Sequence, residues 1–111
     1  MKLQYLTVII IALLSSGIAN ALEFDFTYKG QTLKYKITAE KEVSVEAMDE
    51  NISGDVEIPS EVEFEAKKYK VSCIGDEAFT GCGNIKSVVI PNTVTHIGAE
   101  AFSWSNIHVV I

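Results

Sequence analysis

The sequence predicts a mostly β protein, in which an antiparallel N-terminal segment leads into a short solenoid of one to two stacked coils. Two observations support this prediction. Apolar and polar side chains alternate with a period of two over residues 22–65, which is typical of strands, and a second pattern recurs after 23 residues towards the end of the chain. We therefore expect a signal peptide at residues 1–21, an antiparallel β segment at 22–66 and repeat coils at 67–111.

The first 21 residues have the three parts of a secretory signal peptide. Lys2 gives a basic start, residues 5–14 form an apolar run, and Ala19 and Ala21 form a small-residue cleavage site. The apolar run is well short of the roughly 20 residues that a membrane-spanning helix needs, although an uncleaved anchor is the alternative. We expect cleavage after Ala21, Leu22 as the first mature residue, and a secreted, cell-surface or periplasmic product with no membrane insertion of the mature chain.

The mature chain is strongly acidic. It contains all 15 acidic residues but only eight of the nine basic ones, all lysines, so its formal net charge is −7. This charge argues against nucleic acid and anionic membranes as partners. Ten acids and one lysine lie between Glu40 and Glu65, on the polar phase of the alternation. We interpret these acids as solvated strand faces, with a cation site or a patch for a basic partner as the alternative.

Five stretches of the N-terminal segment alternate apolar and polar residues, and we predict that each is a strand: 24–28, 33–37, 43–47, 56–58 and 62–64. Lys29-Gly30-Gln31 separates the first two stretches as a short glycine-containing turn, which indicates a β-hairpin.

A polar loop, residues 49–55, separates the third and fourth of these strands. Asp49, Asn51 and Ser53 match the first positions of an EF-hand calcium loop, but Ser60 stands where that loop needs a bidentate glutamate. We interpret the loop as a turn of the Asx type and expect no metal site.

The second half of the chain contains an internal repeat. Residues 74–79 (IGDEAF) recur as 97–102 (IGAEAF), and residues 84–88 recur as 106–110 after a one-residue deletion. Residues 56–62 also resemble 88–94, but with a spacing of 32, so we infer an insertion around residues 65–69. A period near 23 lies within the range of leucine-rich repeats, and Ile85-x-x-Val88-x-Ile90 fits their strand pattern.

The residue types fit a coil whose apolar side chains point inward and are buried against the neighbouring coils. Ile85, Val88 and Ile90 are expected to point inward from a strand that Pro91 ends, and Val94 and Ile97 are expected to form a second inward pair. Gly98 allows a tight corner, and Ala101-Phe102 is expected to turn through a short helical or 3₁₀ segment with Phe102 inside the coil. The predicted repeat core is Ile74, Gly75, Ala78, Phe79, Ile85, Val88, Ile90, Pro91, Val94, Ile97, Gly98, Ala101 and Phe102.

The run from Val71 through Ile74-Gly75 and Ala78-Phe79 to Gly81-Cys82 resembles the BspA-type leucine-rich repeat of bacterial surface proteins. The resemblance covers residues 54–111 most strongly. It implies an exported or surface-displayed protein and a non-enzymatic adhesion or protein-binding role, with a host matrix or cell-surface protein as partner. Generic contact surface is expected at Lys86, Ser87, Val89 and Trp104.

The chain departs from this family's pattern near its end. Trp104 and Ser105 replace Gly81 and Cys82, and such arrays usually contain many more coils. A truncated fragment with no independent activity is therefore the alternative. Trp104 is either an exposed binding aromatic or a cover for the last coil.

Few residues offer catalytic chemistry. The chain has no arginine, and its histidines are His96 and His108. Stacked coils place Cys73 beside His96, about 5 Å apart by the strand spacing, but both precede inward residues and are expected to face outward. We predict no enzyme activity, no cofactor and no zinc site, and a secreted hydrolase is a remote alternative. Cys82 is expected to be packed, and whether it pairs with Cys73 is left open.

Overall fold

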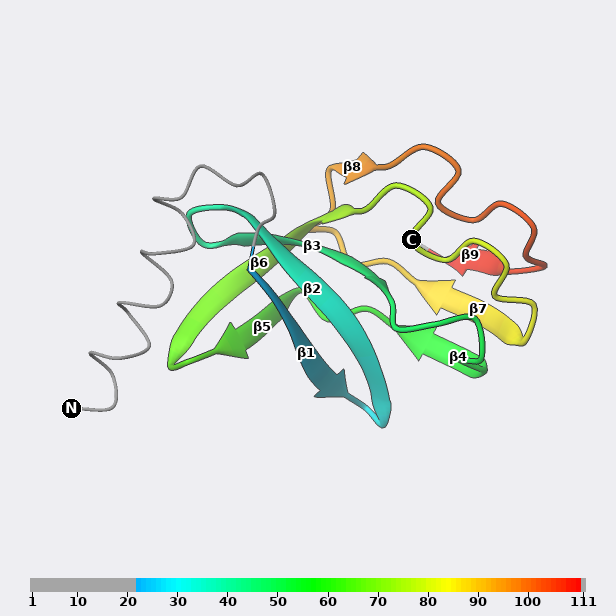
Figure 1. Ribbon diagram of the computed structural model, residues 1–111, viewed down its shortest axis with the longest axis horizontal. Coiled ribbons are helices and arrows are strands. Elements are labelled where there is room, and N and C mark those ends of the chain that lie inside the picture. Colours follow the sequence, from blue (N-terminus) through cyan, green and yellow to red (C-terminus); the bar gives the residue numbers. More distant parts are fainter. Residues whose placement is uncertain (1–21, 111) are drawn as a thin grey trace.

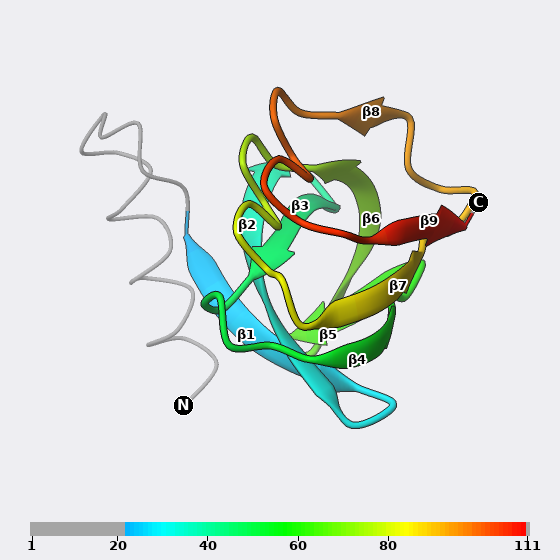
Figure 2. The ribbon, with the colours of Figure 1, turned by 90° about the vertical axis from the view of Figure 1, so that its right-hand side faces the viewer.

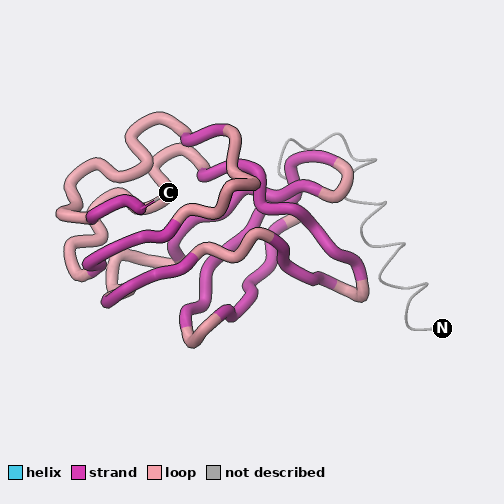
Figure 3. Tube along the Cα trace, turned by 180° about the vertical axis from the view of Figure 1, so that it is seen from behind, coloured by secondary structure: helices cyan, strands magenta, loops and turns pink. Residues whose placement is uncertain are grey.

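The computed structural model describes residues 22–110, which form strands and turns without a helix (Figures 1 and 3), so the expected signal peptide lies outside the described residues. The strands form two sheets, one of six strands and one of three. The larger sheet contains β1 (Glu23–Tyr28), β2 (Gln31–Ala39), β3 (Glu42–Ala47), β5 (Glu61–Phe64), β6 (Lys67–Ile74) and β8 (His96–Ile97). The smaller sheet contains β4 (Gly54–Glu57), β7 (Ile85–Val89) and β9 (His108–Val110).

The first two strands form the predicted hairpin. β1 and β2 pair antiparallel from Glu23 opposite Lys36 to Tyr28 opposite Gln31, and β3 continues the antiparallel sheet. The turn residues Lys29 and Gly30 have φ values of 50° and 81°, which is the left-handed geometry of a two-residue hairpin turn. The prediction of an antiparallel N-terminal segment is therefore confirmed for these strands.

A second hairpin accounts for the longer first repeat unit. β5 pairs antiparallel with β6, and its two-residue turn, Glu65-Ala66, has φ values of 54° and 66°. This turn lies at the insertion that the sequence places around residues 65–69. The hairpin therefore lengthens one unit while β6 continues into the coil.

The expectation that all strands before residue 66 pair antiparallel is wrong for two pairings. β3 runs parallel to β6, with Val43 opposite Val71 and Val45 opposite Ile74, and β4 runs parallel to β7. Parallel neighbours arise because the chain winds around the core and returns in the same direction one layer further on. β3 and β4 together are therefore the first coil.

The coils stack in a constant order. β3, β6 and β8 lie side by side in the larger sheet, and β4, β7 and β9 lie side by side in the smaller one (Figure 2). Val45, Ile74 and Ile97 are register partners through the first stack, and Glu57, Val89 and Val110 through the second. The described residues thus contain three successive strands on each side of the solenoid.

The helical or 3₁₀ segment expected at Ala101-Phe102 is not present, because the connection consists of β-turns. The N–H of Ser103 donates to the carbonyl of Glu100, 3.2 Å away, and the N–H of Thr80 donates to the carbonyl of Glu77 at the same distance. Glu77 and Glu100 have φ values of 56° and 54°. A left-handed residue at this position breaks the right-handed path that a helix requires.

A single apolar core runs through both sheets. Its fully buried side chains come from β2, from β5 and from the first two coils: Leu33, Tyr35, Val43, Val45, Val56, Val62, Val71, Ile74, Phe79 and Val88. Phe24 stacks on Phe64 with ring centroids 4.4 Å apart, and Phe79 stacks on Phe102 at 5.5 Å. Aromatic pairs therefore pack both at the hairpin and within the coil turns.

The tip of the β1–β2 hairpin reaches the outer edge of β4. The ammonium of Lys29 lies 3.0 Å from Glu57 Oε1, and the side-chain amide of Gln31 donates to the carbonyl of Ser53, 2.8 Å away. The hydrogen bond and charge of Glu57 raise the pKa of Lys29. We call the β1–β2 hairpin the N-terminal cap, because its tip contacts the first strand of the smaller sheet at the edge that faces away from β7.

Among residues 22–110, no helix has the length and apolar composition needed to cross a membrane.

Candidate functional site

The outward face of the smaller sheet presents three of the four predicted contact residues, all of them on β7. Lys86 is exposed and Val89 is 37% exposed on β7. Ser87 donates a hydrogen bond to Asp55 Oδ1 on β4, 2.8 Å away, and its register partner on β9 is His108. A polar row, Asp55, Ser87 and His108, therefore crosses all three strands beside the exposed apolar side chain of Val89.

The turns that connect the two sheets also form a stack. Backbone bonds join each turn to the next: Ala47 N–H to the carbonyl of Ala78 (2.9 Å), Glu77 N–H to that of Ala99 (2.9 Å), Phe79 N–H to that of Ala101 (2.7 Å) and Gly81 N–H to that of Ser103 (2.9 Å). These bonds satisfy backbone groups that a loop would leave to solvent. The edge of the solenoid formed by these turns, the turn edge, is therefore held by regular backbone hydrogen bonds between coils, as the sheets are.

An acidic hollow of about 340 Å³ lies in this turn edge between the first and second coils. It is lined by five carboxylates and by no basic residue: Glu46, Asp49, Glu50, Asp76 and Glu77. Asp49 Oδ1 accepts the N–H of Asn51 at 2.8 Å, which confirms the Asx-type turn, and Asp76 Oδ1 accepts the N–H of Ala99 at 2.9 Å. These two bonds fix the loop and the turn that border the hollow.

Of the carboxylates that line the acidic hollow, only that of Glu46 has an ion-pair partner among the described residues. Lys34 lies 3.4 Å from Glu46, whereas Glu50 and Glu77 have no ion-pair partner among the described residues. Residues 22–110 contain no group of three or more His, Cys, Asp or Glu side chains arranged to hold a metal ion. The hollow is therefore a region of negative potential.

A second hollow, of about 560 Å³, lies between the β2–β3 and β5–β6 turns. Its lining has four lysines and three glutamates, and Glu61 lies opposite Lys70 across the hairpin. The two signs of charge offset each other here, so this surface selects no particular charge in a partner.

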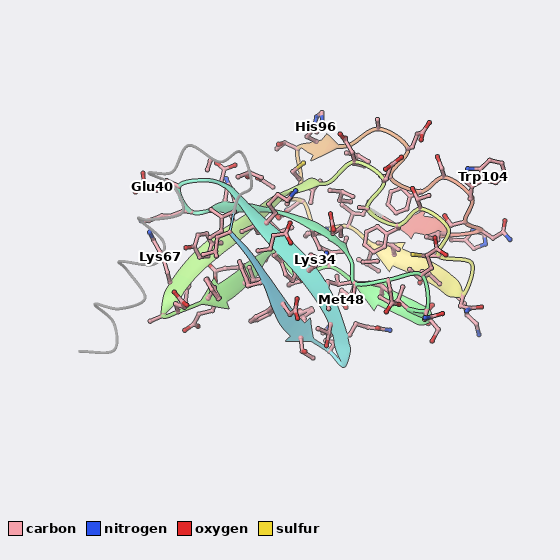
Figure 4. All side chains as sticks on the ribbon, viewed as in Figure 1. Lys34, Glu40, Met48, Lys67, His96 and Trp104 are labelled. Carbon is pink, nitrogen blue, oxygen red and sulfur yellow. The ribbon has the colours of Figure 1, made fainter. Side chains whose placement is uncertain are left out.

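Cys73 and His96 are neighbours, as the repeat spacing predicts. They are register partners on β6 and β8, and His96 is exposed (Figure 4). Burial, with a smaller contribution from the charge of Asp76, raises the pKa of the Cys73 thiol. A raised pKa keeps the sulfur as the weakly nucleophilic thiol at neutral pH, which is the opposite of an activated nucleophile.

Both cysteines are free thiols. Cys82 is only 1% exposed, and burial, followed by the charges of Glu50 and Asp49, raises its pKa. Its sulfur lies 3.9 Å from the carbonyls of Asp49 and Thr80. Cys82 therefore packs between two successive turns.

Most of the predicted repeat core is buried. Ala78, Phe79, Ile85, Val88 and Ile90 are all at most 6% exposed. Pro91 follows the end of β7, Val94 and Phe102 are half-buried, and Gly98 and Ala101 are buried.

The prediction of an inward Val94–Ile97 pair is wrong for Ile97, which is 44% exposed, whereas its repeat equivalent Ile74 is fully buried. Ile74 has a strand on each side, β3 and β8, while Ile97 has only β6 beside it among the described residues. The same side chain is therefore buried in one coil and open in the next because its burial depends on the neighbouring coil.

Trp104 covers nothing. Its side chain is 89% exposed and projects from the last coil away from the molecule (Figure 4). The alternative in which this ring packs over the coil is therefore wrong. Sequence reasoning found Trp104 but missed Asp55 and Glu50, because their partners across the coils are set by the parallel register and not by spacing along the chain.

The chain matches known proteins over most of its length. Residues 50–111 match a family model described as the BspA type leucine rich repeat region (6 copies). A leucine-rich repeat protein from Bacteroides ovatus is 32% identical with a TM-score of 0.62, and a leucine rich cell surface protein from Faecalibacterium prausnitzii is 27% identical with a TM-score of 0.58. Each alignment covers 78% of this chain and 23% of the other.

A third solved structure shares the fold. A leucine-rich repeat protein from Bacteroides capillosus is 21% identical with a TM-score of 0.56, over 77% of this chain and 65% of that one. No curated protein gave a match. The chain thus spans about a quarter of the length of the first two relatives.

Proposed function

This chain belongs to the BspA-type leucine-rich repeat family, and on that basis we propose that it is an exported, non-enzymatic module that binds a protein ligand at a cell surface. Solenoids of this kind use the extended face of their stacked strands to contact other proteins. The proposed ligand is a host matrix or cell-surface protein.

The observation that carries this proposal is the outward face of the smaller sheet. Lys86 and Val89 are exposed on β7, and the Asp55–Ser87 hydrogen bond lies beside them. A rigid strand face that mixes charge, hydrogen-bonding groups and one exposed aliphatic side chain offers both polar and apolar contacts to a protein partner. We propose this face as the primary contact surface.

A non-enzymatic role is supported by the state of the nucleophile best placed for catalysis. The Cys73 thiol has a raised pKa, and its neighbour His96 lies on the exposed edge strand β8. A cysteine hydrolase needs a lowered thiol pKa and a histidine held by a third group. The pairing of Cys73 on β6 with His96 on β8 is better explained as part of a polar row on the surface of the larger sheet.

Export is supported by the signal peptide that the sequence predicts at residues 1–21 and by the relative from Faecalibacterium prausnitzii, whose name describes a cell surface protein. We propose secretion or surface display, with cleavage after Ala21. N-terminal sequencing of the product recovered from a bacterial host would test the cleavage: Leu22 as first residue supports it, and retention of Met1 contradicts it.

A binding experiment tests the function directly. The whole chain, immobilised through a C-terminal tag, is titrated with a panel of purified extracellular-matrix proteins by biolayer interferometry. We expect saturable binding to at least one of them. The double substitution Lys86→Ala and Val89→Ser is expected to weaken that binding by about tenfold or more, as loss of central contacts does.

The matched control is Lys68→Ala on β6. Lys68 is an exposed lysine on the other sheet, so its removal changes the net charge equally without altering the proposed face. Equal weakening by the control and the face variant would contradict the proposed surface. Saturable binding to none of the matrix proteins by a chain that melts cooperatively would favour the alternative of a fragment without independent activity.

A further inference from the structure

The third coil, which contains β8 and β9, keeps apolar side chains at positions that the earlier coils bury. The outer side of an end unit in a solenoid is ordinarily polar, because no neighbouring unit covers it. Here three positions remain apolar and are at least half-open, although their repeat equivalents are buried: Ile97 against Ile74, Phe102 against Phe79, and Ile107 against Ile85. The third coil therefore has the side chains of a covered layer.

The strands of the third coil also have unpaired edges. β8 pairs with β6 and β9 pairs with β7, and neither has a second neighbour among residues 22–110. Figure 2 shows β8 beyond β6 and β9 beyond β7, at the same end of the stack. An unpaired edge presents a row of backbone N–H and C=O groups to which another strand can bond.

The other strand edges of the described residues are guarded. The tip of the N-terminal cap contacts the outer edge of β4. β1 and β5, the end strands of the larger sheet, carry exposed acids at alternate positions: Glu23 and Asp25 on β1, and Glu61 and Glu63 on β5. Charged side chains discourage a further strand from pairing at such an edge. β8 and β9 contain no lysine, acid or proline, so their edges are left open to pairing.

Charge favours a second copy of this chain as the partner at the open end. Residues 90–110 contain one acid, Glu100, and no lysine, although the mature chain carries −7. A hollow of about 520 Å³ beside β8 is lined by residues of the segment 90–97, none of which is an acid or a lysine. Two copies of an acidic chain repel each other least where they meet at an uncharged surface, whereas a basic partner is attracted to the acidic surfaces instead.

The first coil is closed to a second copy. β2 pairs with the outer edge of β3, and the tip of the N-terminal cap contacts the outer edge of β4. The third coil of one copy therefore cannot stack on the first coil of another without displacing the hairpin. The contact that remains joins two third coils about a two-fold axis, and such a contact closes after two copies.

We infer that two copies of the chain pair through their third coils, β8 beside β8 and β9 beside β9, with the paired strands antiparallel. This pairing bonds the open edges of both sheets and covers the apolar side chain of Ile97. It also joins the outward faces of the two smaller sheets into one surface. The inference goes beyond the proposed function, because the partner is the chain itself and no ligand is needed.

The oligomeric state tests the inference. The product recovered from a bacterial host is studied by sedimentation equilibrium over a wide range of protein concentrations. We expect a reversible equilibrium between monomer and dimer that goes no further than two copies, because a two-fold contact uses up the open edges of both partners.

A substitution on the edge of β8 locates the contact. Ile97→Lys places a charge at the open edge and is expected to weaken the dimer about tenfold or more. Met48→Lys is the matched control. Met48 is 42% exposed, close to the 44% of Ile97, but it follows β3 in the first coil, away from His96 on β8 (Figure 4). This control should change the dimerisation constant less than about twofold.

A second substitution keeps the test decisive if Ile97→Lys fails to fold. His96 is exposed, so His96→Glu leaves the core intact and adds an acid to the uncharged end. We expect it to weaken the dimer about fivefold at low ionic strength and less at high salt, where the repulsion is screened. Thr38→Glu adds the same charge at an exposed position of β2 and is its control. Circular dichroism melts verify that each variant folds.

Three outcomes would overturn the inference. A monomer at every concentration would exclude the contact, and a dimer that the two β8 variants weaken no more than their controls would place it on another face. Assembly beyond two copies would contradict the two-fold arrangement. The matrix-protein titration is independent: saturable binding by a chain that stays monomeric would keep the proposed function and reject this pairing.

Discussion

Gly98 lies against Asp76 of the preceding coil, and the two residues fix the distance between successive turns. A Cβ atom on Gly98 would lie 2.5 Å from the backbone nitrogen of Asp76 and 2.7 Å from the carbonyl carbon of Gly75. Gly98 N–H donates to the carbonyl of Ile74 (2.8 Å), and Asp76 Oδ1 accepts the N–H of Ala99 (2.9 Å). The backbones therefore approach so closely at this corner that position 98 has no room for a side chain.

Gly98→Ala is expected to destabilise the fold by about 2 kcal/mol, because the added methyl group meets backbone atoms that cannot rotate away. The measurement is urea unfolding followed by circular dichroism. Gly83→Ala is the control, since a Cβ there meets nothing within 4 Å, and it should change stability by less than about 0.5 kcal/mol. Equal effects of the two substitutions would contradict the close approach at Gly98.

Ile74 and Ile97 occupy the same position in successive coils but differ in burial, being 0% and 44% exposed. Ile74→Ala is expected to cost about 3 kcal/mol, because it leaves a cavity between two neighbouring strands. Ile97→Ala should cost less than about 1 kcal/mol. Chemical denaturation of both variants checks this difference, and similar losses would mean that Ile97 is covered in solution.

Tyr35 is 1% exposed, and its hydroxyl has no hydrogen-bond partner among the described residues. Tyr35→Phe is expected to raise the free energy of unfolding by about 1 kcal/mol, because it removes an unsatisfied buried polar group. Tyr28→Phe, at a partly exposed position of the N-terminal cap, is the control. A loss of stability in Tyr35→Phe would show instead that the hydroxyl is satisfied, for example by an internal water molecule.

The same tyrosine predicts sensitivity to alkali. Burial raises the pKa of Tyr35 above its usual value of 10.0, so above that pH the unfolded chain loses a proton that the folded chain keeps. Stability therefore falls as the pH rises, and Tyr35→Phe should reduce the fall. Urea melts at neutral and strongly alkaline pH measure the effect, and an identical decline in both proteins would contradict it.

The two thiols should react slowly, and in a fixed order. Their raised pKa values lower the thiolate fraction at neutral pH, and Cys82 is also inaccessible at 1% exposure. The variant Cys73→Ser retains only Cys82, and we expect iodoacetamide to modify it only after unfolding. The variant Cys82→Ser retains only Cys73, and we expect iodoacetamide to modify it slowly in the native state. Reaction of Cys73 faster than free glutathione would reveal an activated nucleophile and revive the hydrolase alternative.

Local patterns predicted the elements of the fold better than their pairing. The alternation over 24–37 and the Lys29-Gly30 turn are sufficient for the first hairpin, because both strands and their turn are contiguous in the sequence. The parallel pairing of β3 with β6 joins residues that lie almost thirty positions apart, across an inserted hairpin. Alternation indicates a strand but does not specify its neighbour, so the parallel pairing of β3 with β6 was not predicted.

The candidate sites show the same limit. Lys86, Ser87 and Val89 could be placed outward from the repeat pattern alone, since their neighbours Ile85 and Val88 fit the inward positions. The acidic hollow could not be predicted, because its carboxylates come from two coils and meet only through the stacking of Ala47 on Ala78. A left-handed tryptophan has no local sequence signal apart from the glycine that it replaces.

The N-terminal cap restricts the end of the solenoid at which gene duplication can add coils. Lys29 and Gln31 bind the outer edge of β4, so no coil can be added on that side without displacing the hairpin. Each later coil bonds to the one before it, through its strands and its turn residues. A duplicated 23-residue unit inserted after β7 would therefore find ready partners, and such arrays can lengthen in steps while their starting end stays unchanged.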